Sequence, residues 1–494
     1  MASPAPRTHH QVTFAVLAAG VAAYALLQSL VTPVLPTIQA NLHTNQSTVT
    51  WVLTAYLLSA SIFTPIMGRI GDMIGKERVF VGTLIALALG SLLAALAGNV
   101  QLMIVARAVQ GIGGGVLPLA FGIVRDEYPR EKVSGAVGTI ASLSAVGAGL
   151  GIVLAGPIVD ALDWHWLFWL PMILTIVAAV AAFFLVPPSP VRTPGRISWL
   201  PALLLSAWLV ALLVALSEAP EWGWGSGKVI GLLVAALVLA VVWVWSERRA
   251  AAPLIDMDMM RLPAVWTNNL VALLIGVGMY AVFAFLPEFV QTPTVAGYGF
   301  GADITRSGLM LLPATVTMFL VGTAAGGLAR RIGAKTVVLL GCLVGMLAMV
   351  IFAYAHQHAW QVYVGTGVMG VGFGLAFAAM SSLIVSAVPA EQTGVASGMN
   401  ANIRTIGGSV GAALMASVVT SHPGPGGLPR EAGYTNGFAM LGGALLVAAA
   451  AALLIPVTGR SRTVGGGAEL PADEPAHPQA GLVAGGTLVG DKPE

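Results

Sequence analysis

The sequence is poor in charge and holds a single cysteine, and these two shortages already narrow the class of protein. Asp, Glu, Lys and Arg together account for 9% of the 494 residues, against 57% hydrophobic residues and a mean hydropathy of +0.87. No soluble core can bury that much apolar surface, so the composition indicates an integral membrane protein. The one cysteine, Cys342, lies in an apolar run, which excludes a disulfide framework and a thiolate metal site.

Nucleotide-binding loops are missing as well. The stretch "WGSGKV" (224–229) lacks the first glycine and the hydroxyl residue of a phosphate loop, and "GIGGGV" (111–116) does not complete a dinucleotide fingerprint. No cluster of His, Asp or Glu with catalytic or metal-ligand spacing lies in an apolar run. We therefore expect no enzyme, no metal, no cofactor and no nucleic-acid partner, and an ion gradient as the energy source. One charge moved through 100 mV provides about 2.3 kcal/mol, which sustains a roughly 40-fold concentration gradient.

Apolar runs of the length that a bilayer core requires are what the sequence has in abundance. We predict fourteen transmembrane helices, at 13–35, 48–67, 79–97, 101–121, 134–159, 166–186, 199–216, 229–245, 266–290, 308–329, 337–355, 361–388, 396–420 and 435–457. The predicted fold class is therefore an all-α integral membrane protein in a lipid bilayer. The segment 460–494 is rich in Gly, Pro and acidic residues and has no periodic apolar face, so we predict a disordered tail.

The positive charges predict which side of the membrane each loop faces. With the N-terminus inside, the inner loops and tails hold eighteen Lys and Arg residues, and the outer loops hold only Lys228, Arg306 and Arg430. The positive-inside rule predicts such a bias when the spans are counted correctly. One missed helix would swap the inner and outer loops along the rest of the chain. We therefore expect both termini in the cytoplasm. Arg107 and Arg404 remain inside predicted spans.

Two charged loops on the cytoplasmic side are related to each other. "GRIGDMIGKER" (68–78) joins the second and third spans, and "GGLARRIGAK" (326–335) joins the tenth and eleventh. Their glycines match at a constant offset of 258 residues, which predicts two pseudo-symmetric halves related by an axis along the membrane normal. The expected domains are a cytoplasmic N-tail (1–12), a six-helix bundle (13–186), a linker with two inserted transmembrane helices (187–265), a second six-helix bundle (266–459) and a disordered cytoplasmic tail (460–494).

Three motifs in order carry a resemblance to a known family. The first is the loop Gly68-x-x-x-Asp72-x-x-Gly75-Lys76-x-Arg78, and the second is "RAVQGIGGG" (107–115). The third is "GAGLGIVLAGP" (147–157), followed by "DWHWLF" (163–168). On these motifs the chain resembles the major facilitator superfamily over nearly all of residues 10–460, specifically its fourteen-span drug:proton antiporter branch. The resemblance implies alternating access, proton coupling and export of drug-like molecules.

The loop after the second span also has a physical interpretation. Gly71 and Gly75 permit a tight turn, while Lys76 and Arg78 hold the loop at the anionic inner surface. Asp72 can reach the positive N-terminal end of a neighbouring helix, and the start of the thirteenth span is the candidate. Such a contact would latch the cytoplasmic gate shut. The alternative is a solvated loop that only fixes topology. Arg330 stands at the position of Asp72 in the second half, which therefore lacks the same latch.

Arg107 lies about 9 Å into the fourth span from its outer end, at 1.5 Å per residue. An arginine at that depth faces a cavity or a partner, or its side chain snorkels to the outer headgroups. The resemblance favours a fixed cation that governs proton uptake or substrate release, with Gln110 letting the substrate approach.

In the third motif, small residues predict close helix packing that closes a leak path between the halves, the alternative being generic packing. These residues are Gly147, Gly151 and Gly156, with Pro157 bending the end of the helix.

Proton coupling is the point at which the chain departs from its family. Drug antiporters of this branch carry an aspartate in the first helix, where this chain has Leu27 and Gln28. No Asp or Glu lies near the middle of any predicted span. Glu288 and Asp160, at the outer ends of the ninth and fifth spans, are the nearest carboxylates. We name Arg107, Glu288 and Asp160 as proton-coupling candidates, with a solvated rim position as the alternative for each carboxylate.

A substrate cavity is expected at the midplane between the halves. Tyr24, Gln28 and Thr32 share one face of the first helix, and Gln110 lies on the fourth. On the ninth helix the candidates are Asn269, Tyr280 and Phe283. Sparse polar groups among aromatic side chains suit an amphipathic ligand, although polar stripes can equally hold helices together.

The sequence therefore predicts a monomeric secondary transporter of the bacterial cytoplasmic membrane. It would export drug-like or antibiotic-like amphipaths in exchange for protons. The alternatives within transport are an exporter of an endogenous metabolite and an uncoupled facilitator. A non-transporting membrane receptor or scaffold is the alternative from another class, and it would need neither a gate latch nor a buried Arg107.

Overall fold

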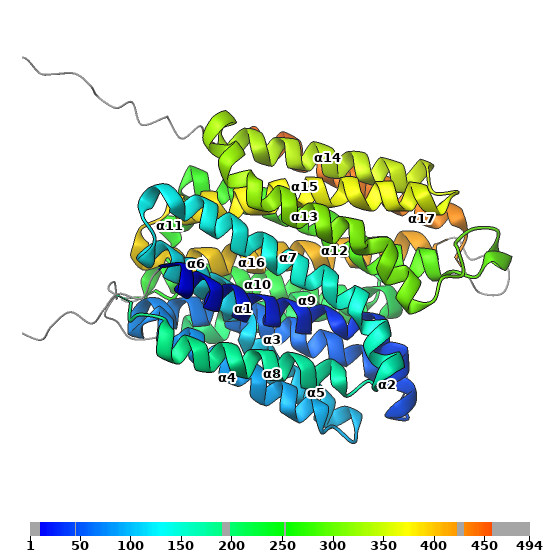
Figure 1. Ribbon diagram of the computed structural model, residues 1–494, viewed down its shortest axis with the longest axis horizontal. Coiled ribbons are helices and arrows are strands. Elements are labelled where there is room, and N and C mark those ends of the chain that lie inside the picture. The colour runs from blue at the N-terminus through cyan, green and yellow to red at the C-terminus, as the bar shows by residue number, and fades with distance from the viewer. Residues whose placement is uncertain (1–9, 45, 190–197, 251–252, 422–428, 457–494) are drawn as a thin grey trace, which may run out of the picture. The chain divides into compact units, whose positions relative to one another are not determined.

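The computed structural model describes residues 10–44, 46–189, 198–250, 253–421 and 429–456, and within them it is built of helices joined by short turns (Figure 1). Fourteen of its helical segments are long and apolar enough to cross a membrane, so the predicted all-helical fold with fourteen spans is confirmed. The predicted disordered tail and most of the N-terminal tail lie outside the described residues.

Six spans come from the first part of the chain. They are formed by α1 (His10–Leu30), α3 (Gln46–Ile74), α4 (Lys76–Ala95), α5 (Val100–Gly111) continuing through η2 (Ile112–Gly115) into α6 (Val116–Glu127), α7 (Arg130–Ala161) and α8 (Trp166–Leu185). The short elements η1 (Thr32–Val34) and α2 (Leu35–Asn41) lie between α1 and α3. Two further spans, α9 (Trp199–Trp222) and α10 (Gly227–Arg249), follow and pack against each other.

The remaining six spans come from the second part. They are α12 (Pro263–Gln291), α13 (Ile304–Ile332), α14 (Ala334–Tyr354), α15 (Ala359–Ala387), α16 (Thr393–Thr420) and α17 (Glu431–Ala452). Short helices precede some of them: α11 (Met257–Arg261), η3 (Thr294–Ala296) and η4 (Ala390–Gln392). We refer to α1–α8 and α12–α17 as the first and second halves.

Several helix pairs join the halves, and two of these pairs make the largest contacts. Figure 1 shows α7 alongside α13, and the two helices pack closely, as do α3 and α16. The inserted helix α9 contacts both α3 and α16, so it lies against the first half and the second half at once. The predicted domain boundaries stay predictions, but the pairing places a junction between the halves at the centre of the described helices.

The internal repeat is present in the backbone. Gly75 has φ 118° and ψ 125°, and Gly333, which is 258 residues later, has φ 88° and ψ 141°. Only glycine adopts this region readily, so the matching glycines make the same turn in both halves. Close approaches repeat too. A Cβ on Gly68 would lie 2.5 Å from the carbonyl oxygen of Gly394, and one on Gly326 would lie 2.9 Å from Cα of Gly135.

The turn between α3 and α4 is tighter than predicted. Helix α3 continues to Ile74, so Gly71 lies inside it and makes no turn; its missing side chain instead leaves room for Leu119 of α6. Gly75 alone forms the turn. The side chain of Lys76 is fully buried, so our expectation that it faces the anionic membrane surface is wrong, whereas Arg78 is 67% exposed as expected.

Candidate transport cavity and gate

A cavity of about 520 Å³ lies between the two halves. Residues of α1, α3, α5 and α7 line it from the first half, and residues of α12 and α16 line it from the second. The inserted helix α9 adds Leu213, Leu216, Ser217 and Pro220 to its wall. A hydroxyl contact of 3.4 Å between Thr54 of α3 and Ser217 ties α9 to the first half.

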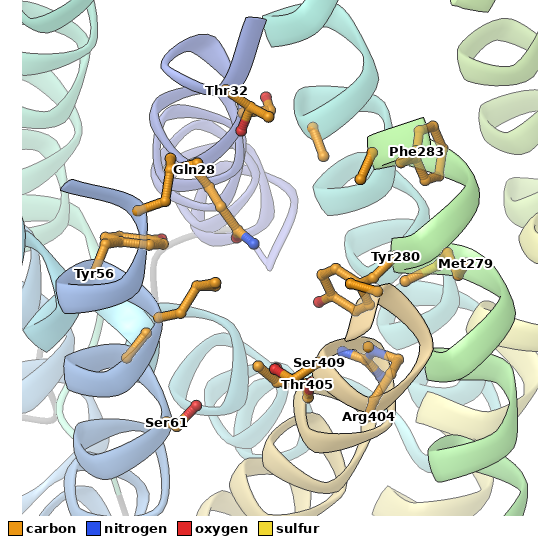
Figure 2. Close-up of a pocket in the computed structure, with 18 of the residues that line it drawn as sticks. Gln28, Thr32, Tyr56, Ser61, Met279, Tyr280, Phe283, Arg404, Thr405 and Ser409 are labelled. Carbon is orange, nitrogen blue, oxygen red and sulfur yellow. Dashed lines mark hydrogen bonds between the residues drawn. The ribbon is translucent and has the colours of Figure 1, made fainter. Parts of the chain in front are cut away.

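Most of the predicted cavity residues lie where we expected them. Gln28 on α1 and Thr32 on η1 face Tyr280 and Phe283 on α12 across an open space (Figure 2). Tyr24 also lines the cavity. The four-residue spacing of Tyr24, Gln28 and Thr32 and the aromatic residues of α12 therefore identified two walls of the cavity in the sequence.

Two predicted cavity residues lie elsewhere. Asn269 is buried between α12 and α16, where its side-chain oxygen accepts a 2.8 Å hydrogen bond from Nδ2 of Asn400. Gln110 is fully buried behind the cavity, and its amide donates to Ser91 of α4. Neither is among the described lining residues. Both hold helices together, which is the alternative that polar stripes allow.

Arg107 neither snorkels nor reaches the surface. Its side chain is fully buried and lines the cavity. The guanidinium donates to the carbonyl oxygen of Val52 at 3.1 Å and to Oε1 of Gln110 at 2.8 Å, and its carbon lies 4.3 Å from the ring centroid of Tyr56. These partners are neutral, so the positive charge is oriented but not compensated.

A second arginine lines the cavity, and the sequence analysis gave it no role. Arg404 on α16 is 6% exposed and lies beside Tyr280 (Figure 2). Its guanidinium carbon is 4.2 Å from the ring centroid of Phe377. Its position inside a predicted span was the one sequence feature that could have indicated a functional role. Which face of α16 turns to the cavity follows only from its packing against α12.

The two carboxylates proposed for proton coupling are outside the cavity lining that the structure describes. Glu288 is exposed near the end of α12 and accepts a 3.0 Å hydrogen bond from the hydroxyl of Tyr434. Asp160 is exposed near the end of α7. Both positions match the solvated rim alternative, so Arg107 is the one candidate of the three that lines the cavity.

The first motif makes the predicted contact with the thirteenth span. Oδ2 of Asp72 accepts a hydrogen bond of 3.3 Å from the backbone N–H of Val395, in the first turn of α16. Amides in a first helical turn lack partners within the helix, and the helix dipole attracts negative charge there. We call this interaction, together with the close approach of Gly68 and Gly394, the gate contact.

Further charged residues of the first half hold the same segment of the second half. Nζ of Lys76 forms hydrogen bonds of 3.0 and 2.9 Å to Asp126 and one of 3.4 Å to the carbonyl oxygen of Ala390. Arg125 donates to the carbonyl oxygen of Val385 at 2.7 Å and to the hydroxyl of Thr393 at 2.6 Å. These contacts close the cavity at the end where α3 and α6 finish and α16 begins, which we call the basic end.

The glycines of the third motif pack against two different helices. Gly147 and Gly151 pack against α1 of their own half, while Gly156 packs against Thr305 of α13 in the other half. Our expectation of a single face between the halves is therefore wrong for the first two. Pro157 is exposed near the end of α7. Gly156 alone of the predicted set contacts across the junction.

In the part of the chain that the structure describes, fourteen apolar spans and a central cavity define a multi-pass membrane protein, and comparison with known proteins identifies its family. The family model of the Major Facilitator Superfamily matches residues 17–412 and 293–484. The chain belongs to this superfamily.

Curated relatives include proteins named for drug transport. The multidrug transporter protein MdtP of Bacillus subtilis is 27% identical over 385 residues, covering 76% of this chain and 70% of the relative. The multidrug resistance protein Stp of Mycobacterium tuberculosis is 27% identical over 395 residues, covering 79% and 72%. An uncharacterised MFS-type transporter of M. tuberculosis is 28% identical over 82% of this chain, which spans 59% of that relative's length.

A solved structure shares the fold. The human organic anion transporter MFSD10 superposes with a TM-score of 0.67 at 16% identity, covering 90% of this chain and 99% of that one. At that identity the likeness concerns the arrangement of the helices.

Proposed function

We propose that this protein exports amphipathic small molecules from the bacterial cytoplasm by alternating access, as a monomer driven by proton antiport. The observation that carries the proposal is a cavity lined from both halves and closed at the basic end by contacts between them. Membership of the superfamily and relatives named multidrug transporters support it. The positive-inside rule assigns the basic end to the cytoplasm.

Alternating access requires contacts that can break at one end without unfolding either half. The gate contact has this character, because Asp72 and Val395 belong to different helices and different halves. Arg125 and Lys76 likewise reach across from the first half, to backbone oxygens in the last turn of α15 and just before α16. Opening of the basic end would break these bonds together and admit substrate from the cytoplasm.

Replacing Asp72 by Asn is expected to reduce export roughly tenfold while leaving the amount of inserted protein unchanged. The amide keeps the shape of the side chain but removes the charge, and a hydrogen bond to a charged group contributes about 1.5–3 kcal/mol. The measurement is efflux per unit of protein in proteoliposomes. Asp258→Asn removes an equal charge from an exposed position on α11 and serves as the control. Unchanged efflux in Asp72→Asn would remove the gate contact from the mechanism.

The transport proposal is tested with three dansyl probes that share one ring system: the acid dansylglycine, the neutral dansylglycinamide and the amine dansylcadaverine. Flux of at least one probe must exceed that of protein-free liposomes, and an applied pH gradient must accelerate it. Arg107→Ala is expected to lower flux and Glu288→Gln to leave it unchanged, because only the former side chain lines the cavity. Equal flux with and without the gradient would contradict proton antiport.

An uncoupled facilitator is the second candidate, and one observation favours it. The described lining of the cavity contains no Asp or Glu that could carry a proton through it. Flux that responds to a membrane potential but not to a pH gradient would establish this alternative.

A further inference from the structure

The cavity between the halves carries positive charge without negative charge. Arg107 comes from the first half and Arg404 from the second, and among the described residues of the lining no other side chain is charged at neutral pH. The residues are 0% and 6% exposed. Neither forms an ion pair with any carboxylate in the part of the chain that the structure describes.

Neutral groups position both guanidinium ions. Arg107 lies over Tyr56 and bonds to a backbone carbonyl and to an amide oxygen, and Arg404 lies over Phe377. Nη2 of Arg107 and Nε of Arg404 have no hydrogen-bond partner among the described residues. Cation–π contacts and neutral acceptors orient a guanidinium, yet they leave its net charge in place.

Two uncompensated cations in a membrane-embedded cavity are energetically costly. An ionised side chain away from bulk water is stabilised chiefly by an opposite charge with good hydrogen-bond geometry. Arginine offers planar paired donors that match a carboxylate or a sulfonate. A carboxylate or sulfonate of a bound ligand can therefore supply the negative charge that the cavity lacks.

The remaining walls suit the body of such a ligand. Met279, Phe283 and Phe285 of α12 and Leu213 and Leu216 of α9 give the cavity apolar surfaces. Hydroxyl groups of Thr405 and Ser409 lie on α16 near Arg404 (Figure 2). A ligand with an aromatic or aliphatic body and one acidic head would place its body against the apolar walls and its head against the arginines and hydroxyl groups.

We propose that the substrates of this transporter are amphipathic organic anions, whose carboxylate or sulfonate group binds at Arg107 and Arg404. The proposal rests on the transport function proposed above and narrows its substrate class. It also gives a reason for a neutral Gln28 in the cavity wall, because a carboxylate there would repel an anionic ligand.

An anionic substrate changes the energetics of export. Cells keep their interior negative, so an anion that leaves moves down the electrical gradient, and this potential adds to the driving force of proton antiport. A potential of 100 mV supports a roughly 40-fold gradient of a monovalent anion. The described lining, with arginines and without carboxylates, fits such a pathway.

The three dansyl probes test the inference by binding to wild-type protein in nanodiscs of uncharged lipid, read as energy transfer from tryptophan to dansyl. We expect dansylglycine to bind at least tenfold more tightly than dansylglycinamide, the equivalent of about 1.4 kcal/mol. We expect dansylcadaverine to bind more weakly than both. An amide that binds as tightly as the acid, or an amine that binds best, would overturn the inference.

Variants assign the preference to the arginines. Arg404→Gln is expected to remove most of the discrimination between acid and amide, and Arg404→Lys to retain part of it because the charge is kept. Arg306→Gln removes a charge from an exposed position on α13 and should leave the ratio unchanged. A ratio that survives in both Arg404→Gln and Arg107→Gln would place the anion preference outside this cavity and refute the assignment.

The binding and flux experiments separate the two proposals. Selective binding of dansylglycine without flux of any probe would uphold the anion site and refute export. Flux of dansylcadaverine alone would uphold export and refute the anion site. Flux of dansylglycine that rises both with a pH gradient and with an inside-negative potential, set with potassium and valinomycin in proteoliposomes, is the result expected when both are correct.

Discussion

Replacing Lys76 by Met is expected to lower the free energy of unfolding by about 3–5 kcal/mol, the usual effect of removing one partner from a buried ion pair. Nζ of Lys76 is 2.9 Å from Asp126 and 4.0 Å from Asp72, and the side chains of all three are at most 2% exposed. Met preserves the apolar stem, which packs over Gly122. The variant therefore isolates the loss of charge that leaves two buried carboxylates unpaired.

Thermal unfolding of the purified protein in detergent, with size-exclusion chromatography for aggregation, measures this effect. Arg78→Met is the matched control, because it removes the same charge two residues away from a side chain that is 67% exposed. We expect the control to change stability by no more than about 0.5 kcal/mol. Adding Asp126→Asn to Lys76→Met should restore part of the loss. A Lys76→Met protein that unfolds like wild type would show that the cluster does not depend on its cation.

The number of spans was predictable because each bilayer crossing leaves its own apolar run in the sequence. The partner of Asp72 was predictable for a related reason. The alternation of loops placed the start of the thirteenth span on the same side as the α3–α4 turn, and a free helix N-terminus attracts a carboxylate. Topology and local electrostatics together were enough to identify this contact.

Depth and rotation of the helices were not predictable in the same way. Asn269 and Tyr280 lie on one helix, yet Asn400 of α16 pairs with the first and only the second reaches the cavity. That outcome depends on how α12 and α16 are rotated against each other. Periodicity along one helix carries no information about the neighbouring one. The same limit explains why Arg404 was noticed inside a span but given no role.

The contribution of α9 could not be read from the sequence either. An inserted helical pair interrupts the repeat, and hydropathy shows only that both helices span the membrane. The structure places α9 against α3 and α16, where Trp224, two residues after the end of the helix, donates a 2.7 Å hydrogen bond to Ser417. The insert thus belongs to the cavity wall, and Leu213, Leu216 and Ser217 are additional positions at which substrate preference can be changed.

Replacing Gly68 by Val is expected to abolish transport without preventing insertion. A Cβ at this position would lie 2.5 Å from the carbonyl oxygen and 2.7 Å from the carbonyl carbon of Gly394. Both atoms are backbone of α16, so no side-chain movement relieves the clash. Overpacking of this kind costs about 3 kcal/mol, and the cost falls only on the conformation in which α3 and α16 touch. The closed basic end should therefore become roughly a hundredfold less populated.

Cysteine accessibility measures the closed population directly. In a Cys342→Ala background, Ser61→Cys places one thiol in the cavity wall, and a membrane-impermeant maleimide added to inside-out vesicles reports access from the cytoplasm. Gly68→Val should raise the labelling rate strongly. Gly82→Val is the control, because a Cβ on Gly82 meets no atom within 4 Å. Slow labelling and normal efflux in Gly68→Val would mean that the halves do not separate at α3 and α16, and the alternating-access proposal would then need a different moving junction.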